Sequence, residues 1–460
     1  MSEVATPPAD PGSQVRSKRY QVLLLFAAVI GVLVSLASWG FLELVHAIQV
    51  GVYTDLPGDL GFDTVPSWWP LPWLALAGIL TAFAIQRLPG NGGHVPADGL
   101  STGGKPTQPI DLPGVLLAAL ATLGLGLVLG PEAPLIALGM GLGILAFRLV
   151  RKDAPQQAVG LMAAAGSFAA VSTIFGSPVI GAVIIIEAAG LGGPTLPLVL
   201  LPGLLASGVG SLVFIGMGSW TGLSTSAYAL TPFSLPPFSG PGWGDFGWTI
   251  VVAIVAAFVA FVIIEVARRS TRIVSTRPFV FTMVAALAVG GLAIAFNQAT
   301  DRSTDAVLFS GQDAFGSLLK DAPTLSLTTL ALLLIFKGAA WSISLGSFRG
   351  GPTFPAIFLG VVGGLLAAHL PGYSETPAVA VLMGAGVVSI LRLPLSSVVI
   401  ALLLTSKAGL GVAPLIIVGV VTAYVATEML SARRVSITET APTHAGEARV
   451  AAAGTPPAAA

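Results

Sequence analysis

Long apolar runs separated by short polar stretches follow one another along almost the whole chain. The first, 21–50, exceeds the ~20 residues that a membrane-spanning helix needs and is too long for the apolar core of a signal peptide. Several later runs are shorter than ~20 residues, which favours tilted and half-spanning helices. The pattern predicts an all-α polytopic membrane protein. Its later runs are 72–88, 110–129, 132–149, 156–173, 177–190, 194–217, 249–267, 279–296, 325–346, 353–370, 376–390, 395–408 and 411–431.

The composition agrees with this interpretation. Of the 460 residues, 54% are hydrophobic and only 9% are charged, against about a quarter charged in soluble domains. The zero net charge indicates no nucleic-acid partner, and the absence of cysteine excludes disulfides and thiolate metal sites. The 56 glycines and 34 prolines predict backbone breaks inside the membrane. Such breaks persist only where protein or a water-filled cavity covers the freed polar groups.

Charge placement predicts the topology. Three cations, Arg16, Lys18 and Arg19, precede the first span, whereas 51–67 holds three aspartates and no lysine or arginine. The positive-inside rule then places the N-terminus in the cytoplasm, and Arg433-Arg434 after the last span place the C-terminus there too. We expect a disordered cytoplasmic leader (1–20), one membrane domain (21–434) and a disordered cytoplasmic tail (435–460) in a multi-pass protein of the cell membrane.

The membrane domain contains an internal repeat. The segment GPEAPLIALGMGLGILAF (130–147) matches GPTFPAIFLGVVGGLLAA (351–368) in its glycines, prolines and apolar positions. In the same order, 169–187 resembles 384–404, so the repeat halves lie at about 70–217 and 249–431. Paired repeats with broken helices are typical of transporters whose site lies between the repeats, near the bilayer midplane.

Each Gly-Pro motif is predicted to open a helix whose first amides have no partner. These are the amides of Glu132, Ala133, Thr353 and Phe354, and the Thr353 hydroxyl is a further donor. A helix N-terminus carries about half a positive charge. Two of them, brought together by the repeat, predict an anion site without a formal cation.

Glu132 lies where the anion would bind. Its carboxylate could occupy the site and then take up a proton and leave, which makes it a candidate gate, since an ionisable group in an apolar span indicates function. The alternative is a carboxylate that caps its own helix.

Four further polar residues have open interpretations. Glu187 is either a structural acid tied to a backbone amide or an arginine, or part of a proton relay. His94 is either a loop contact or a ligand, and the loop contact is favoured because nothing nearby completes a metal site. Lys337 and Arg392 lie in apolar runs, where they snorkel or pair internally.

From about residue 21 to 431 the chain resembles the CLC family of chloride channels and Cl⁻/H⁺ antiporters. The 130–134 segment resembles the family motif GREGP, whose glutamate is the external gate, and 92–96 and 351–355 are similar to GSGIP and GIFAP. The segment from Phe175 to Glu187 resembles the one that leads into a pair of glutamates. The resemblance implies inverted repeats and a homodimer with one anion pathway per subunit.

The chain departs from the family pattern at defined positions. Gly93 stands where the family has its central serine, and Ala188 where antiporters have an internal proton-transfer acid. Pro131 and Pro352 remove amides that the family can offer to anions. The family tyrosine that reaches the central site has no counterpart here.

We therefore expect transport of chloride or a similar small anion, channel-like and without proton coupling. Gly93, His94, Glu132, Ala133, Thr353 and Phe354 would bind the anion, while Glu187, Ala188 and Arg392 are structural or proton-path candidates. A proton-coupled chloride or fluoride antiporter is the alternative. An intramembrane hydrolase is a distant one, because four histidines, no cysteine and no HExxH motif leave it without a recognisable catalytic set. We expect no enzymatic activity, metal or cofactor; membrane lipid and a second copy of the chain are the expected partners.

Overall fold

The computed structural model describes residues 12, 15–100, 106–193, 196–222 and 230–439. In this part of the chain, eight helices are long and apolar enough to cross a membrane, and five shorter apolar helices accompany them. The all-α prediction is confirmed. The helices are α2 (Lys18–Val50), α3 (Leu56–Asp59), α4 (Pro70–Arg87), α5 (Leu112–Gly124), α6 (Glu132–Val150), α7 (Gln156–Ile174), α8 (Pro178–Ala188), α9 (Leu196–Thr221), α10 (Trp243–Thr276), α11 (Pro278–Thr300), α12 (Phe315–Asp321), α13 (Leu327–Ser347), α14 (Thr353–Ala367), α15 (Glu375–Leu391), α16 (Pro394–Leu404) and α17 (Ala413–Glu439).

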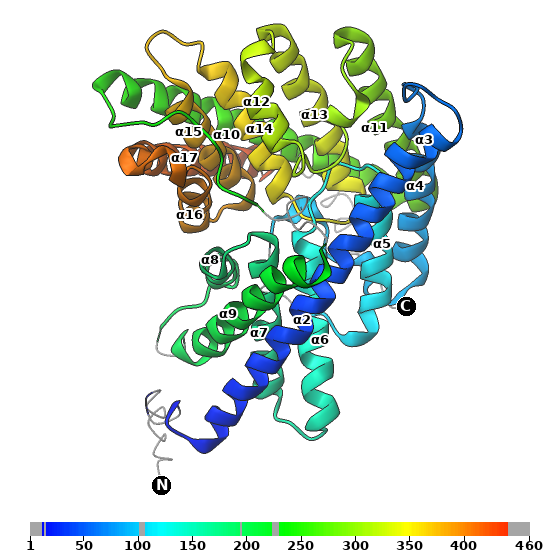
Figure 1. Cartoon of the computed structure of the whole chain (residues 1–460), viewed down its shortest axis with the longest axis vertical. Coiled ribbons are helices and arrows are strands. Elements are labelled where there is room, and N and C mark those ends of the chain that lie inside the picture. The colour runs from blue at the N-terminus through cyan, green and yellow to red at the C-terminus, as the bar shows by residue number, and fades with distance from the viewer. Residues whose placement is uncertain (1–11, 13–14, 101–105, 194–195, 223–229, 440–460) are drawn as a thin grey trace, which may run out of the picture.

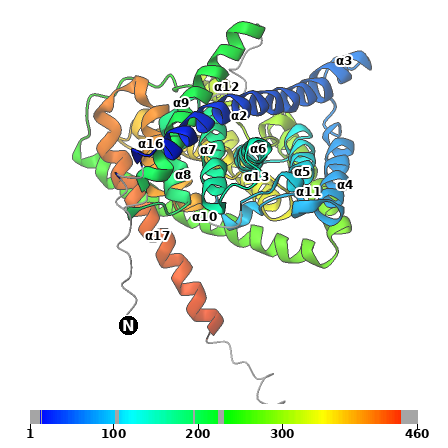
Figure 2. The ribbon, with the colours of Figure 1, turned by 90° about the horizontal axis from the view of Figure 1, so that it is seen from below.

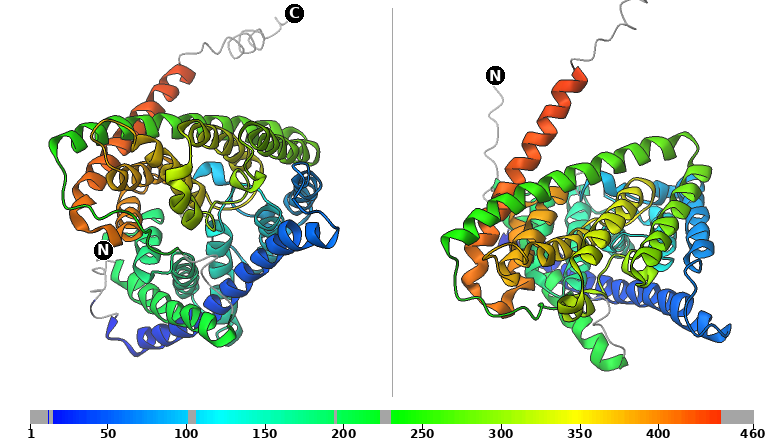
Figure 3. Two further views of the ribbon diagram at one scale, coloured as in Figure 1. Left: turned by 45° about the horizontal axis from the view of Figure 1, so that its top comes forward. Right: turned by 90° about the horizontal axis from the view of Figure 1, so that it is seen from above.

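Long tilted helices enclose the shorter ones. Helix α2 crosses the molecule obliquely in Figure 1, and α10 runs along one whole edge in both views of Figure 3. The far end of α17 projects beyond the body (Figure 2). Helices α8, α14 and α16 are 11, 15 and 11 residues long. They are too short to span a bilayer alone, so they end inside it.

The two repeat halves use equivalent contacts. Helix α6 packs along α7, and α14 packs along α15. In each pair, glycine lets the backbones approach closely, since a methyl group on Gly139 would meet the Gly166 carbonyl and one on Gly360 would meet the Met383 backbone. The predicted inverted-repeat bundle with tilted and half-spanning helices is confirmed.

Several predicted boundaries differ from the structure. Helix α2 begins at Lys18, inside the predicted leader, because the Ser17 hydroxyl caps it by accepting a hydrogen bond from the Tyr20 amide (3.2 Å). Helix α17 continues to Glu439, past the predicted start of the tail. Helix α10 continues to Thr276, past the predicted end at 267, and α12 lies in a predicted loop. The rest of the predicted leader and tail, 1–11, 13–14 and 440–460, lies outside the described residues.

Lys337 anchors the core of the second half. Its side chain is 0% exposed, so it does not snorkel, and it pairs internally. The Nζ atom donates to the carbonyl oxygens of residues 306–309, at 3.1, 3.2, 2.7 and 3.2 Å. It also lies 4.6 Å from the centre of the Phe358 ring. One buried ammonium thus ties α13, the 306–309 loop and α14 together.

Candidate anion site

The two Gly-Pro motifs meet directly. Gly130 and Gly351 form an antiparallel bridge with N···O distances of 2.7 and 2.6 Å. A Cβ atom at either position would overlap with the Glu132 carboxylate. Glycine is therefore required at both, and the bridge brings the N-termini of α6 and α14 to one place.

The motif prolines precede the helices rather than begin them. Pro131 (φ −84°, ψ −1°) and Pro352 (φ −89°, ψ −10°) are the N-cap residues of α6 and α14. Glu132 and Thr353 are consequently the first helical residues. The expectation that proline occupies the first helical position was wrong for both motifs by one residue, but the amides that follow are those predicted.

The Glu132 carboxylate lies on the N-terminus of the other repeat's helix. Its Oε1 accepts a hydrogen bond of 2.9 Å from the Phe354 amide, and the side chain is only 1% exposed. The amides of Glu132 itself and of Thr353 also lie around the carboxylate. The predicted donors Glu132, Thr353 and Phe354 therefore surround one position, whereas Ala133 is not among them.

Two polar atoms beside this hydrogen bond have no partner. Glu132 Oε2 and Thr353 Oγ1 are both buried without a hydrogen bond in the described structure. Unpaired buried polar atoms are costly, so they mark a place where a proton or ligand can be accommodated. The Thr353 side chain lies beside the Glu132 carboxylate, yet neither its hydroxyl nor Glu132 Oε2 has a fixed hydrogen bond in this conformation.

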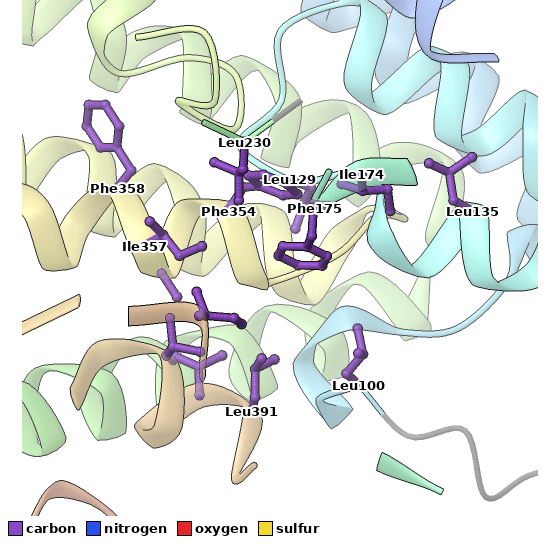
Figure 4. Close-up of a cluster of buried hydrophobic side chains, with 14 of the residues drawn as sticks. Leu100, Leu129, Leu135, Ile174, Phe175, Leu230, Phe354, Ile357, Phe358 and Leu391 are labelled. Carbon is purple, nitrogen blue, oxygen red and sulfur yellow. The ribbon is translucent and has the colours of Figure 1, made fainter. Parts of the chain in front are cut away.

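Apolar side chains close one side of the site. The Phe354 ring stacks on Phe175, with 5.5 Å between centroids and 12° between planes. Figure 4 shows these rings with Leu129 and Ile174 beside them and Leu391 and Leu100 below. All six belong to one buried hydrophobic cluster, so apolar side chains occupy the space between Phe354 and Leu391 in the described structure.

A small pocket reaches the site from the other side, and sequence reasoning missed it. It has a volume of about 40 Å³, enough for two or three waters. Pro131 and Leu129 line it, opposite His46, Ser310 and Asp313. Partial desolvation by the surrounding protein raises the pKa of the Asp313 carboxyl to about 6, although the nearby His46 acts to lower this pKa. We name it the outer pocket, since it lies on the side predicted to be external.

A larger pocket of about 350 Å³ lies on the opposite side, and we name it the inner pocket. It is lined by Asp98, Leu100, Ala188, Leu391 and Arg392, among others. Two of the sequence candidates, Ala188 and Arg392, thus come together there with the loop that follows Gly93 and His94. Leu100 and Leu391, which line this pocket, lie below Phe354 in Figure 4.

Both carboxylate oxygens of Glu187 accept hydrogen bonds from the start of α16. Its Oε1 accepts from the Leu395 amide at 2.8 Å, and its Oε2 accepts from the Ser396 amide and hydroxyl at 2.7 and 2.6 Å. A carboxylate from α8 thereby caps α16. Arg392 also has side-chain partners, Glu428 at 3.0 Å and Ser431 at 2.6 Å.

His94 makes a local loop contact, with its Nε2 2.7 Å from the Gly99 carbonyl oxygen. Gly93 has φ +97°, a conformation that favours glycine over the serine of the family pattern. Neither residue contacts Glu132 in the described structure. Among the described residues, no group of three or more His, Cys, Asp or Glu side chains could hold a metal.

Known proteins resemble this chain over most of its length. Its residues 73–428 match the family model described as voltage gated chloride channel. An ion-transport protein, YfeO, of Escherichia fergusonii is 27% identical over 361 residues, which are 77% of this chain and 81% of that protein. YfeO of an Escherichia coli strain matches to the same extent.

Two solved structures share the fold. One is a slow cyanobacterial Cl⁻/H⁺ antiporter, with a TM-score of 0.72, 19% identity and coverage of 89% of this chain and 94% of that one. The other is a CLC-type fluoride/proton antiporter, with a TM-score of 0.68, 18% identity and coverage of 89% and 96%. With the family match spanning most of the membrane domain, this chain belongs to the voltage gated chloride channel (CLC) family of anion transport proteins.

Proposed function

We propose that this chain conducts chloride or a similar small anion through a pathway gated by Glu132, without coupling to protons. One observation carries the proposal: the Glu132 carboxylate of the first repeat binds the Phe354 amide of the second. A carboxylate in an amide cradle stands in for the anion that the cradle would otherwise hold.

The pockets suggest the route. The outer pocket reaches Pro131, next to Glu132, and the inner pocket ends at Leu100 and Leu391, below Phe354. In the proposed route, Glu132 and the Phe175–Phe354 stack would block passage between the two pockets. An anion would pass when the carboxylate leaves the Phe354 amide and the apolar side chains move apart.

Protonation provides a reason for the carboxylate to leave. Glu132 Oε2 has no hydrogen-bond donor, so it can accept a proton without losing a contact. A neutral carboxyl group is a weaker acceptor for the Phe354 amide than a carboxylate is, and it is less favoured by the helix N-terminus. An incoming anion then competes more successfully for the same amide.

The cradle is built without a formal cation. The described structure shows no ion pair to Glu132 from any lysine or arginine. Binding by amides and helix ends alone is weak enough to let an anion leave, as conduction requires.

Ala188 supports uncoupled transport. It lies on the inner pocket and cannot titrate, and its neighbour Glu187 is held by the start of α16. A second candidate is proton-coupled exchange of chloride or fluoride. It is favoured by Asp98, an acid on the inner pocket, and by the two related structures, both described as proton antiporters.

Flux in liposomes tests the proposal. Purified protein would be reconstituted and given gradients of chloride, fluoride or nitrate, while anion efflux and internal pH are recorded together. We expect anion flux with no proton movement beyond that of protein-free vesicles. Proton uptake driven against its gradient by a chloride gradient would refute the uncoupled mode and favour exchange. No flux of any of the three anions would refute the transport proposal itself.

The homodimer stays a prediction of the family resemblance. A mass measurement on the protein in detergent, corrected for bound detergent, distinguishes one copy from two.

A further inference from the structure

A large open cavity of the described structure is lined by none of the residues of the candidate anion site. It has a volume of about 1240 Å³, above the ~300–1,000 Å³ usual for pockets that hold drug-sized ligands. It lies between the start of α2, the turn from α6 to α7, and helices α8 and α9. In Figure 1 the start of α2 and the α6–α7 turn are both at the lower end of the molecule. The lining residues of this cavity include neither Glu132 nor any residue that lines the outer or the inner pocket.

One end of the cavity is basic. Lys18 and Arg19 line it from the start of α2, and Arg151 and Lys152 line it from the α6–α7 turn. Asp153 is the one acid among the lining residues, which leaves a net charge of +3. In the described part of the chain none of these four cations forms an ion pair.

Helix ends add to the positive potential. Helices α2 and α7 both begin at this cavity, and neither has an acidic residue in its first turn. At the start of α7, Pro155 is the N-cap and offers no side-chain hydrogen bond, so the first amides are not capped by it. Their partial charges favour an anion at this end.

Most of the other lining residues are apolar, with Ser17, Tyr20, Gln157 and Ser167 as the polar ones. The apolar part of the wall is formed by Leu23, Phe26, Phe147, Leu161, Ile185 and Val199, with the Phe26 and Phe147 rings edge to face at 5.2 Å. Val22 and Val150 line the cavity and are also 42% and 64% exposed. Because such exposed valines in spanning helices face the bilayer, the cavity is continuous with the lipid-facing surface.

We infer that this cavity binds an anionic phospholipid of the leaflet on the basic side of the protein, which the positive-inside rule assigns to the cytoplasm. The phosphate would lie among Lys18, Arg19, Arg151 and Lys152, and an acyl chain would lie along Phe26 and Phe147. Basic pockets between helices on the cytoplasmic side suit such headgroups. A soluble phosphate matches only the basic end, whereas a phospholipid matches both ends. The inference does not depend on which anion is transported.

Lipid retention measured by native mass spectrometry tests it. The full-length protein would be released from mixed micelles that contain equal amounts of phosphatidylglycerol and phosphatidylcholine. With a net charge of +3 at the site, we expect phosphatidylglycerol to be retained at least about a hundredfold over phosphatidylcholine. At roughly 1 kcal/mol for each cation near a headgroup, Arg151→Gln/Lys152→Gln should weaken that retention about thirtyfold.

The matched control is Arg272→Gln/Arg277→Gln, which removes two exposed arginines near the end of α10 that do not line the cavity. It should leave retention unchanged. Equal retention of the two lipids by the unaltered chain would overturn the inference, as would equal losses in both double variants. Displacement of phosphatidylglycerol by glycerol phosphate at similar concentration would overturn it in favour of a soluble anion. The lipid comparison needs no variant, so it remains decisive if a substitution impairs folding.

Discussion

Gly130 and Gly351 each donate a backbone hydrogen bond to the other, although 220 residues of sequence lie between them. Such a reciprocal antiparallel pair is what two equivalent segments form when they meet across a pseudo-two-fold axis. The pair fixes the separation of the two helix starts, and with it the reach of Glu132 to the Phe354 amide. The contact between Glu132 and the Phe354 amide, on which the proposed gate rests, therefore depends on two residues that have no side chain.

Gly351→Ala tests whether the contact between Glu132 and the Phe354 amide needs a glycine at position 351. A methyl group there would occupy the position of the Glu132 carboxylate, so the carboxylate must leave the Phe354 amide or the bridge must open. We expect flux to lose most of its dependence on pH, and the free energy of unfolding to fall by about 1–3 kcal/mol from overpacking. Liposome flux at several pH values and thermal unfolding in detergent measure the two effects.

Gly291→Ala is the matched control for that substitution. Gly291 is in α11, and a methyl group there meets no atom within 4 Å. It should leave flux unchanged and stability equal or slightly higher. If Gly351→Ala had the flux profile and unfolding temperature of the wild type, a methyl group at this position could not be displacing the Glu132 carboxylate.

Glu132→Gln tests the gate directly. Glutamine keeps the shape of the side chain but cannot titrate, and its oxygen accepts from the Phe354 amide more weakly than a carboxylate does. We expect higher flux at neutral pH and a ratio of flux at pH 5 to flux at pH 7.5 close to one. The control, Glu265→Gln, changes an acid of α10 that pairs with Arg269 outside the pathway. Unchanged flux at every pH would exclude Glu132 as the gate.

Glycine and proline made the repeat helices predictable from sequence. Helices α6 and α14 begin where the predicted apolar runs begin, one residue after the motif proline, and α8 and α16 begin within one residue of their predicted runs, because proline cannot continue a preceding helix but is tolerated at the start of a new one. The end of α10 was not predictable in this way. Its arginines mark where the membrane ends, yet arginine is a good helix former, so the helix continues to Thr276.

The contacts of the site were less predictable than its location. Helix-start amides can be recognised in sequence, but the occupation of the Phe354 amide by Glu132 depends on the spatial arrangement of the repeats. Lys337 was recognisable as a cation in an apolar run, whereas its four carbonyl partners lie in a loop about thirty residues away with no periodic signal. Only the fold brings Asp313 and His46 into one pocket with Pro131, the residue before Glu132.

Lys337→Met should destabilise the protein strongly. Methionine keeps the apolar stem but leaves the carbonyl oxygens of 306–309 without their donor in a buried place. Each unsatisfied buried group costs about 1–3 kcal/mol, so a loss of at least ~2 kcal/mol is expected even if the loop relaxes. Thermal unfolding in detergent measures it. Lys320→Met, at an exposed position in α12, should change little; equal effects of the two would refute the anchoring role.

Glu187 should act through structure rather than proton transfer. Glu187→Ala removes the acceptor for two amides at the start of α16, which should cost about 1–2 kcal/mol. Glu187→Gln keeps one oxygen acceptor and should cost less, with anion flux and proton movement unchanged. Unfolding temperatures and simultaneous flux and pH records compare the three proteins. A change in proton movement for Glu187→Gln, at normal stability, would instead assign this residue to a proton path.

Asp313 should make stability depend on pH in a defined direction. Its carboxyl pKa rises from 3.8 to about 6 on folding, because the surrounding protein disfavours the charged form. Above pH 6 the folded state therefore holds a disfavoured charge. As the pH falls from about 6 toward 4, the folded protein takes up a proton that the unfolded chain does not, so stability rises.

Asp313→Asn removes that charge at every pH. The variant should unfold at a higher temperature than the wild type at pH 7.5, by a few degrees at most, because Asp313 is only partly shielded by protein and the solvent that still reaches it screens its charge. The difference should shrink as the pH falls and vanish near pH 4, where both side chains are neutral. Thermal unfolding in detergent between pH 4 and 8 measures this, with Asp63→Asn, in the 51–67 loop, as the control. A difference between Asp313→Asn and wild type that is constant across this range, or that grows toward low pH, would show that the carboxylate is not disfavoured by folding.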